Sequence, residues 1–256
     1  MVSRTAPISV QLYSLREASA ESFDAVLEQL ASIGYAGVEP FNLFGKSPTE
    51  FKQQVESLGM RISSSHYPWV NRADDLGQVA DTLAALGLTR APGGYMPDDF
   101  ADMDAVKRTT EQVANLVDTL AGHGLTLCLH NHWWEYRELD GVVPYHYLQD
   151  QLPGVEFEID TYWAANFGKR DPAEEVARVA SRAPLLHIKD GPLVRDEPHV
   201  AAGTGNMDIP AVLAAADPNT LEWAIVELDA CATDMMTAVA QSYTYLTTNN
   251  LAKGNV

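Results

Sequence analysis

The chain has 256 residues, of which 46% are hydrophobic, enough to bury a large core. Its 17 lysines and arginines stand against 35 acidic residues, and the net charge of −18 is spread along the chain. Such a surface repels a phosphate backbone, so nucleic acid is not an expected partner. The sequence has no apolar run of about 18 residues, so we expect no membrane span.

The N-terminus and the cysteines indicate the compartment. Residues 1–7 contain no apolar run of the kind that a secretory signal requires. Cys128 and Cys231 fall in or beside strand-like runs, and neither has a CxxC partner. We therefore expect two reduced cysteines in a cytoplasmic protein.

Strand-like and helix-like patterns alternate along the whole chain. Alternating or continuously apolar runs predict eight strands, with the fourth the weakest because Arg90, Pro92 and two glycines interrupt it. The strands are expected at residues 8–14, 37–41, 61–66, 88–93, 127–135, 155–160, 185–190 and 224–229. Helical spacing and caps such as Ser47-Pro48 and Asp171-Pro172 predict a helix after each strand. These helices are expected at residues 23–33, 48–58, 76–86, 106–120, 143–152, 171 onward, 210–216 and 235–247.

This alternation predicts right-handed βαβ units and a parallel sheet. Eight repeats allow the sheet to close into a barrel, for which ~250 residues are typical. An open doubly wound sheet would require a glycine-rich turn after the first strand, but residues 13–17 contain no glycine. The prediction is a single (β/α)8 TIM barrel, one domain over residues 1–256.

Polar residues stand at or near the carboxyl ends of most predicted strands. In a parallel barrel these ends open on one face, where active sites lie. The residues are Gln11, Glu39, His66, His130, Asp160, His187 and Glu227. Two imidazoles and two carboxylates from successive strands (His130, Asp160, His187 and Glu227) predict a site for a divalent metal ion: Mn, Co, Zn, Fe or Mg.

Structural explanations compete with the functional ones. His130 and His66 are alternatively core histidines that neighbouring hydroxyls satisfy, and Lys189 is alternatively an ion-pair partner of Asp190. Asp190 and Asp229 are expected to cap turns or orient ligands, and Gly203 and Gly205 to form turns. His123, His146 and His199 are expected to be solvated.

Several motifs together carry a resemblance that covers nearly the whole chain. They are Leu129-His-Asn-His-x-x-Glu135, Asp160-Thr-Tyr-Trp-Ala164, Leu186-His-Ile-Lys-Asp-Gly191, Gly203-x-Gly-Asn-Met-Asp208 and Val226-Glu-Leu-Asp229. The chain resembles the xylose isomerase-like TIM-barrel superfamily, in its sugar phosphate isomerase/epimerase branch. That superfamily includes ketose epimerases, inosose isomerases and dehydratases, enzymes that process keto-glycosides, and an AP endonuclease branch.

The resemblance implies metal ligands on strands five to eight. Asp160, His187 and Glu227 match the family's positions, whereas the usual glutamate on strand five is His130, so that this ligand is alternatively His132 or Glu135. A second glutamate that contacts substrate in the epimerases corresponds to Glu135. A histidine three residues past the aspartate ligand is replaced here by Trp163, which weakens the transfer of those enzymes' specificity.

We therefore expect a metal-dependent isomerase or epimerase that acts on a sugar, keto-sugar or inosose through a metal-stabilised enediolate. Glu227 or Glu135 is expected to take the proton, Lys189 and His66 to donate hydrogen bonds, and the tryptophans to stack on the sugar. Further expected substrate contacts are Gln11, Glu39, His132, Trp133, Trp134 and Trp163. The alternatives are a lyase of the inosose dehydratase or keto-glycoside-eliminating type on the same site, and a non-catalytic sugar-binding barrel. The sequence is compatible with a homo-oligomer.

Overall fold

Eight parallel strands form one curled sheet in the computed structural model, which describes residues 5–255. Residues 1–4, part of the segment in which no signal peptide is expected, lie outside the described residues. The strands are hydrogen-bonded in the order β3-β2-β1-β8-β7-β6-β5-β4. Their bounds are β1 Ile8–Gln11, β2 Gly37–Glu39, β3 Arg61–Ile62, β4 Arg90–Gly93, β5 Thr126–His130, β6 Glu156–Asp160, β7 Leu185–Ile188 and β8 Trp223–Val226.

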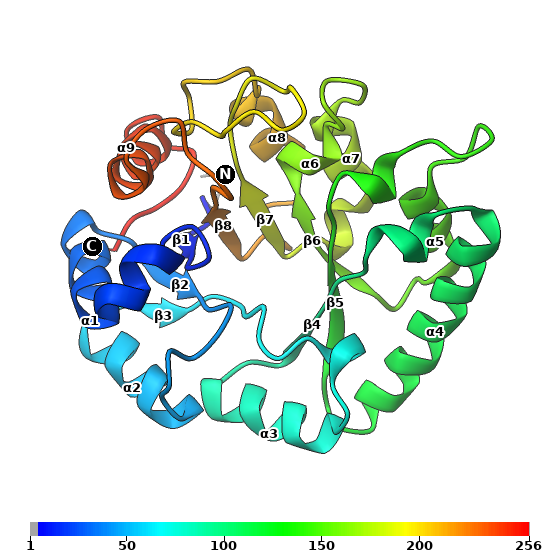
Figure 1. Cartoon of the computed structure of the whole chain (residues 1–256), viewed down its shortest axis with the longest axis horizontal. Helices are drawn as coiled ribbons and strands as arrows, with labels where there is room; N and C mark the ends of the chain where they lie inside the picture. The colour runs from blue at the N-terminus through cyan, green and yellow to red at the C-terminus, as the bar shows by residue number, and fades with distance from the viewer. Residues whose placement is uncertain (1–4, 256) are drawn as a thin grey trace.

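Helices surround this sheet as a ring in chain order (Figure 1), which confirms the predicted (β/α)8 barrel. Their bounds are α1 Arg16–Ile33, α2 Pro48–Ser57, α3 Leu76–Leu86, α4 Met103–Ala121, α5 Pro144–Gln151, α6 Thr161–Ala164, α7 Pro172–Val179, α8 Ile209–Ala215 and α9 Met235–Thr248. The short α6 was not predicted. It begins directly at the end of β6, because the Asp160 carboxylate accepts a hydrogen bond from the Trp163 N–H and caps it.

The helix caps that the sequence predicts are formed. The Ser47 hydroxyl accepts from the Glu50 N–H while the Glu50 carboxylate accepts from the Ser47 N–H, a capping box at the start of α2. Asp171 accepts from Ala173 at the start of α7. Strand β3 is shorter than predicted, but the Ser63 and His66 N–H groups still donate to carbonyls of the segment that contains β2. The backbone that carries His66 therefore stays tied to the sheet.

Alternate residues of β5, β7 and β8 enter two separate cores. Leu127 and Leu129 of β5 belong to the large core that includes the helices, whereas Cys128 between them belongs to a second, small cluster. That second cluster consists of Ala36, Cys128, Leu185, Trp223 and Ile225. Successive side chains of a strand point to opposite faces of the sheet, so the small cluster lies on the inner face, inside the barrel. These apolar side chains therefore fill the barrel interior toward the amino-terminal ends of the strands, and polar side chains occupy the carboxyl end.

Charged contacts stabilise the amino-terminal end of the barrel. The Arg61 guanidinium lies 4.5 Å from the centroid of the Trp223 ring. Arg90 of β4 forms ion pairs with Glu156 of β6 and with Glu222, which precedes β8. These contacts tie β3 and β4, the two strands beside the open seam, to the start of β8 across the barrel.

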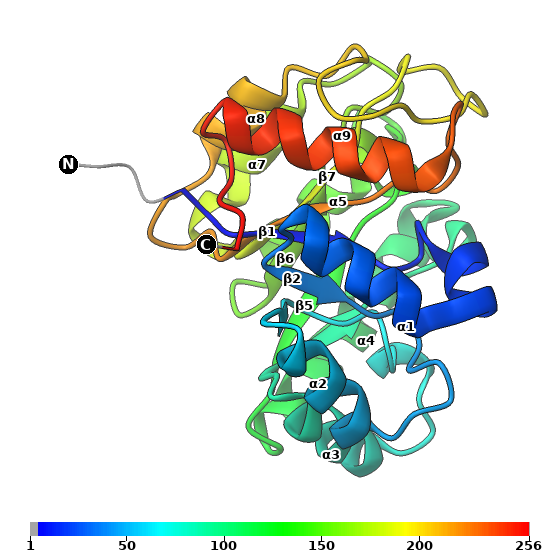
Figure 2. The same cartoon turned by 90° about the vertical axis from the view of Figure 1, so that its left-hand side faces the viewer.

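The two ends of the described chain meet beside β1. The Ile8 N–H donates to the Lys253 carbonyl at 2.8 Å, and α1 and α9 run side by side on this flank (Figure 2). Both cysteines are free; Cys128 is buried and Cys231 half-buried. Among the described residues, no helix has the length and apolar character needed to cross a membrane.

Candidate metal centre at the carboxyl ends of the strands

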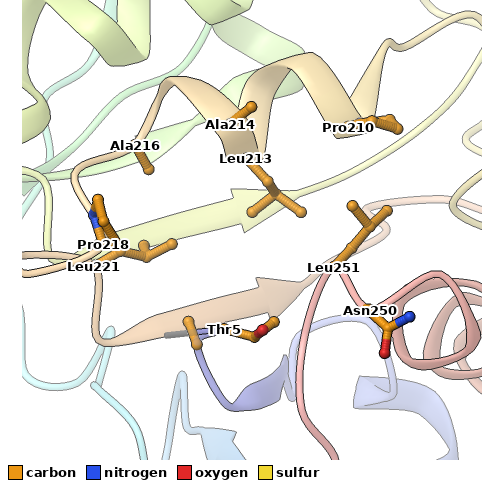
Figure 3. A pocket seen from close by; sticks show the side chains of 10 residues that line it. Thr5, Pro210, Leu213, Ala214, Ala216, Pro218, Leu221, Asn250 and Leu251 are labelled. Atoms are coloured by element: carbon orange, nitrogen blue, oxygen red, sulfur yellow. The ribbon is translucent and has the colours of Figure 1, made fainter. Parts of the chain in front are cut away.

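A cavity of about 380 Å³ opens at the carboxyl ends of the strands. Aromatic side chains form its wall and ionisable groups form its floor. Its lining residues are Tyr13, Phe41, His66, Trp69, Arg72, Met96, His130, His132, Trp134, Lys189, Glu227 and Asp229. The pocket in Figure 3, of about 270 Å³, lies at the opposite end, where residues before β1 and β8 meet α8, and its lining carries no ionisable side chain. Of these two pockets, the first is therefore the one whose lining can do acid–base or ligand chemistry.

The register of the sheet brings the four predicted metal ligands together. Asp160 pairs with His187 across β6 and β7, while His130 and Glu227 come from the flanking strand ends. One donor atom from each of the four residues lies within 4.8 Å of every other, and all four side chains are buried. Four donor atoms this close together have the spacing of ligands around a single ion.

The chemistry of these four residues fits a divalent metal ion. Burial lowers the pKa of His130 well below its usual range, so its imidazole is neutral, as a metal ligand must be. Burial also opposes the charge of His187, but Glu158, Glu39 and Glu227 raise its pKa well above the usual range, so an ion would have to displace its proton. His130 Nδ1 and Asp160 Oδ2 are buried without an aligned hydrogen-bond donor or acceptor. Buried polar atoms without such partners are rare, and a bound ion satisfies them. A mixed set of imidazoles and carboxylates suits Mn²⁺, Fe²⁺, Co²⁺ or Zn²⁺.

His187 is held from both sides by carboxylates. Its Nδ1 lies 2.8 Å from Glu227 Oε2, and its Nε2 lies 2.8 Å from Glu39 Oε2. Gln11 Nε2 donates to the same oxygen of Glu39 at 2.7 Å. Gln11 and Glu39 are fully buried and do not line the cavity, so the structure places these two predicted substrate contacts behind His187. A carboxylate at the far nitrogen of a ligating histidine fixes the orientation of its ring.

Glu158 was missed as a site residue in the sequence. Its carboxylate contacts His66 and lies 3.2 Å from His130 Nδ1 and 3.4 Å from His187 Nε2. Burial opposes ionisation, but His187 and His66 outweigh it and hold the pKa of Glu158 well below its usual range. Glu158 completes a second set of four possible metal donors with His66, His130 and His187. The alternation of β6 was the available signal, since Glu158 stands two residues before Asp160 and shares its face.

Lys189 is a buried cation surrounded by carboxylates. Its Nζ lies 2.7 Å from Asp160 Oδ2, 2.8 Å from Glu227 Oε2 and 2.8 Å from Asp229 Oδ2. Burial disfavours the ammonium, but the three carboxylates raise the pKa of Lys189 well above its usual range. The alternative of an ion pair with Asp190 is wrong, because the chain turns the Asp190 carboxylate away to other partners.

Asp190 organises the loop after β7, as expected of a turn cap. Its two carboxylate oxygens accept hydrogen bonds from four backbone N–H groups, those of Gly191, Gly203, Gly205 and Met207. A Cβ on Gly205 would lie 2.2 Å from Asp190 Oδ1, so only glycine fits there. The Gly203-x-Gly205 motif therefore wraps a carboxylate, which agrees with its expected role as a turn.

Glu135 lies beneath the turn after β5 and does not line the cavity. Its Oε2 accepts from the His132 N–H at 2.9 Å, and burial raises its pKa. Its neighbours His132 and Trp134 do line the cavity and stack with ring centroids 4.2 Å apart. Trp163 is also off the lining, but its ring centroid lies 5.3 Å from the Lys189 ammonium.

The expectation that His199 is solvated is wrong. This side chain is buried against Tyr162 and Trp163, and its Nδ1 accepts a hydrogen bond from the Asp229 N–H at 3.1 Å. Burial, and then the charge of Lys189, lower the pKa of His199 to about 4. A neutral histidine therefore joins the loop after β7 to the end of β8.

Residues 27–241 match the family model described as the xylose isomerase-like TIM barrel. The chain belongs to this family. The match covers most of the barrel, including all the strand ends from β2 to β8 that form the candidate centre. A comparison with curated proteins finds no significant match.

Solved structures with this fold include several sugar-processing enzymes. A sugar phosphate isomerase/epimerase from Parabacteroides distasonis is similar over 98% of this chain and 97% of its own, with a TM-score of 0.78 and 22% identity. A D-allulose 3-epimerase from Methylomonas sp. has a TM-score of 0.68 and 17% identity over 96% of this chain and 98% of its own. A probable 3-DHS dehydratase from Bacillus anthracis has a TM-score of 0.72 and 12% identity over 94% of this chain and 98% of its own. These likenesses establish the fold.

Proposed function

We propose that this protein is a divalent-metal-dependent isomerase or epimerase that acts on a sugar, keto-sugar or inosose by proton abstraction. The observation that carries the proposal is the convergence of His130, Asp160, His187 and Glu227 within 4.8 Å. Two of them, His130 and Glu227, line a cavity with an aromatic wall. The family membership and the similarity in fold to sugar isomerases and epimerases support it.

His130, Asp160, His187 and Glu227 would hold the ion, which would supply Lewis acidity that makes the carbon next to a substrate carbonyl easier to deprotonate. The side chains of the chain bind and orient the sugar. Trp134 and Trp69 offer flat apolar faces to a sugar ring, and His66 and Lys189 offer hydrogen-bond donors to its hydroxyls. Glu227 takes the proton, since it is the one predicted proton acceptor on the cavity lining. Glu135 is buried off the lining and would reach the substrate proton only after a movement of the turn that follows β5.

Exchange with solvent tests this function. We expect Mn²⁺-loaded protein incubated in D₂O with a panel of ketoses and inososes to place deuterium on a carbon that the substrate retains. Protein stripped with a chelator is expected to lose this exchange and to regain it with Mn²⁺. Exchange that continues unchanged after complete metal removal would contradict the metal-dependent mechanism.

A lyase on the same centre is the second candidate, and the similarity in fold to a probable dehydratase favours testing it. Proton abstraction next to a β leaving group ends in elimination, with the same residues. Release of water or aglycone in the same incubations would identify the lyase. A barrel that binds sugar without catalysis would instead bind members of the panel without exchange or release.

Substitution of the ligands tests the centre itself. We expect Asp160→Asn and His187→Ala to abolish both metal binding and turnover, because each removes one of four donors. The far-ultraviolet circular dichroism should stay that of the wild type. Asp140→Asn makes the same chemical change at an exposed residue and should change neither property. Full metal occupancy in Asp160→Asn would exclude this ligand set and point to the set that contains Glu158.

A further inference from the structure

The ammonium of Lys189 contacts the same carboxylates that the proposed ion requires. Its Nζ lies 2.7 Å from Asp160 Oδ2 and 2.8 Å from Glu227 Oε2, and both residues belong to one donor set. The lysine side chain is only 1% exposed, so water screens little of its charge. A divalent ion in this donor set and the Lys189 ammonium are therefore two cations that require the same two carboxylates.

The third carboxylate differs from the other two. Asp229 is absent from that donor set, and its contact with Lys189 at 2.8 Å has the alignment of a hydrogen bond. Asp160 Oδ2, in contrast, has no aligned donor despite the nearby ammonium. The Asp229 side chain is 34% exposed and lines the cavity. Asp229 is thus the partner that Lys189 can keep when the other two carboxylates bind an ion.

We propose that Lys189 and the divalent ion compete for Asp160 and Glu227, so that ion binding transfers the ammonium from three carboxylates to Asp229 alone. This inference rests on the metal centre of the proposed function and adds a coupling to it. In the ion-bound protein, the N–H groups that Lys189 withdraws from Asp160 and Glu227 face the cavity, where they donate to substrate oxygens. Loading with the ion therefore prepares the substrate-binding donor.

The consequence for affinity is measurable without any substrate. Lys189→Met removes the competing charge and keeps a buried chain of similar length. We expect isothermal titration with Mn²⁺ at one fixed pH to show binding about 5- to 150-fold tighter than in the wild type, the range of a typical coupling between sites. The metal-free variant should unfold at a lower temperature than the metal-free wild type, because Asp160, Glu227 and Asp229 lose their counter-ion, and Mn²⁺ should raise its unfolding temperature by more.

Asp229→Asn provides the second arm, because it removes the partner that the displaced ammonium keeps. We expect this variant to bind Mn²⁺ more weakly than the wild type. The same substitution in the Lys189→Met background should have no such effect, since no ammonium remains to be displaced. A loss of affinity that persists in the double variant would make Asp229 a direct ligand and overturn the competition. If Lys189→Met does not fold, unchanged Mn²⁺ affinity in Asp229→Asn overturns it equally.

The outcomes separate this inference from the function beneath it. Wild-type protein that binds Mn²⁺, together with Lys189→Met that binds it equally or more weakly, overturns the competition and leaves the metal centre standing. If the wild type binds no Mn²⁺ and the Lys189→Met variant does, the competition is supported, and the lysine ammonium holds the carboxylates more tightly than Mn²⁺ does. Failure of both proteins to bind Mn²⁺, Zn²⁺ or Co²⁺ overturns the metal centre and the competition together.

Discussion

Glu39 shows how a residue off the cavity still controls the chemistry of the site. Its carboxylate accepts from Gln11 and from His187 Nε2. This leaves Nδ1, which lies 2.8 Å from Glu227 Oε2, as the nitrogen that the proposed ion would take. Burial is the main cause that raises the pKa of Glu39 to about 7, and the Glu158 charge adds to it. Glu39 is therefore a positioning residue in our interpretation, and its direct contact with substrate stays a prediction.

We expect Glu39→Gln to weaken Mn²⁺ binding by about 10- to 100-fold, the usual cost of losing a carboxylate behind a ligating histidine. The neutral amide no longer favours the ring orientation that directs Nδ1 to the ion. Isothermal titration measures the change, and Glu28→Gln on the exposed face of α1 is the control. Mn²⁺ affinity equal to that of the wild type would show that Glu39 does not orient His187.

The Glu135→Gln variant distinguishes a catalytic role of Glu135 from a structural one. Its carboxylate accepts the His132 N–H, so Glu135→Gln keeps one acceptor oxygen for this contact but removes the base. We expect Mn²⁺ affinity and unfolding temperature close to those of the wild type, with kcat lowered by about 10²- to 10⁴-fold if Glu135 takes the substrate proton. Unchanged kcat would leave Glu227 as the base and Glu135 as a cap of its turn.

At the scale of the element, strand pattern and caps were readable from the sequence, but contacts across the barrel were not. Period-two alternation and the apolar runs located all eight strands, and ends such as Asp160 and His187 followed from the parallel sheet. The alternation of β6 puts Glu158 on the same face as Asp160, but its convergence with three histidines depends on contacts across the barrel. His199 was misjudged because its burial depends on how a long loop folds back on β8.

The loop after β7 offers a prediction that depends on sterics alone. A Cβ at Gly205 would lie 2.2 Å from Asp190 Oδ1 and 2.5 Å from the Gly191 nitrogen, so Gly205→Ala must displace the carboxylate or the backbone. We expect a loss of about 1–3 kcal/mol in the free energy of unfolding by urea, as for other overpacked sites. Gly154→Ala is the control, since its nearest neighbour is a Val117 methyl carbon at 3.9 Å. Equal stabilities of the two variants would contradict this steric account of the motif.

At the scale of the whole molecule, the arrangement of charge matters more than its net value of −18. The charged groups at the amino-terminal end of the barrel, such as Arg90 and Glu156, are partly exposed. The ionisable groups at the carboxyl end are instead buried. Buried ionisable groups cost solvation energy and are kept where they are paired or functional. The stability of the barrel should therefore depend on pH through a few buried groups at the site. The effect of His199 is the easiest to measure by itself, because His199 is not one of the proposed metal ligands.

His199 makes this pH dependence testable. Its pKa is about 4 in the folded chain against 6.5 in the reference state, so between these values the unfolded chain binds a proton that the folded chain does not. The contribution of His199 to stability is complete above pH 6.5 and is lost as the pH falls toward 4, by about 3 kcal/mol in total.

We expect His199→Asn, whose side-chain oxygen replaces Nδ1 as acceptor for the Asp229 N–H, to lack this loss. Urea unfolding of both proteins between pH 7 and pH 4 with a chelator present measures it, because the carboxylates common to both cancel in the difference. The wild type should lose about 3 kcal/mol more than the variant over this window. Parallel curves would mean that the pKa of His199 is the same in the folded and unfolded chains, which would contradict a histidine held neutral by burial.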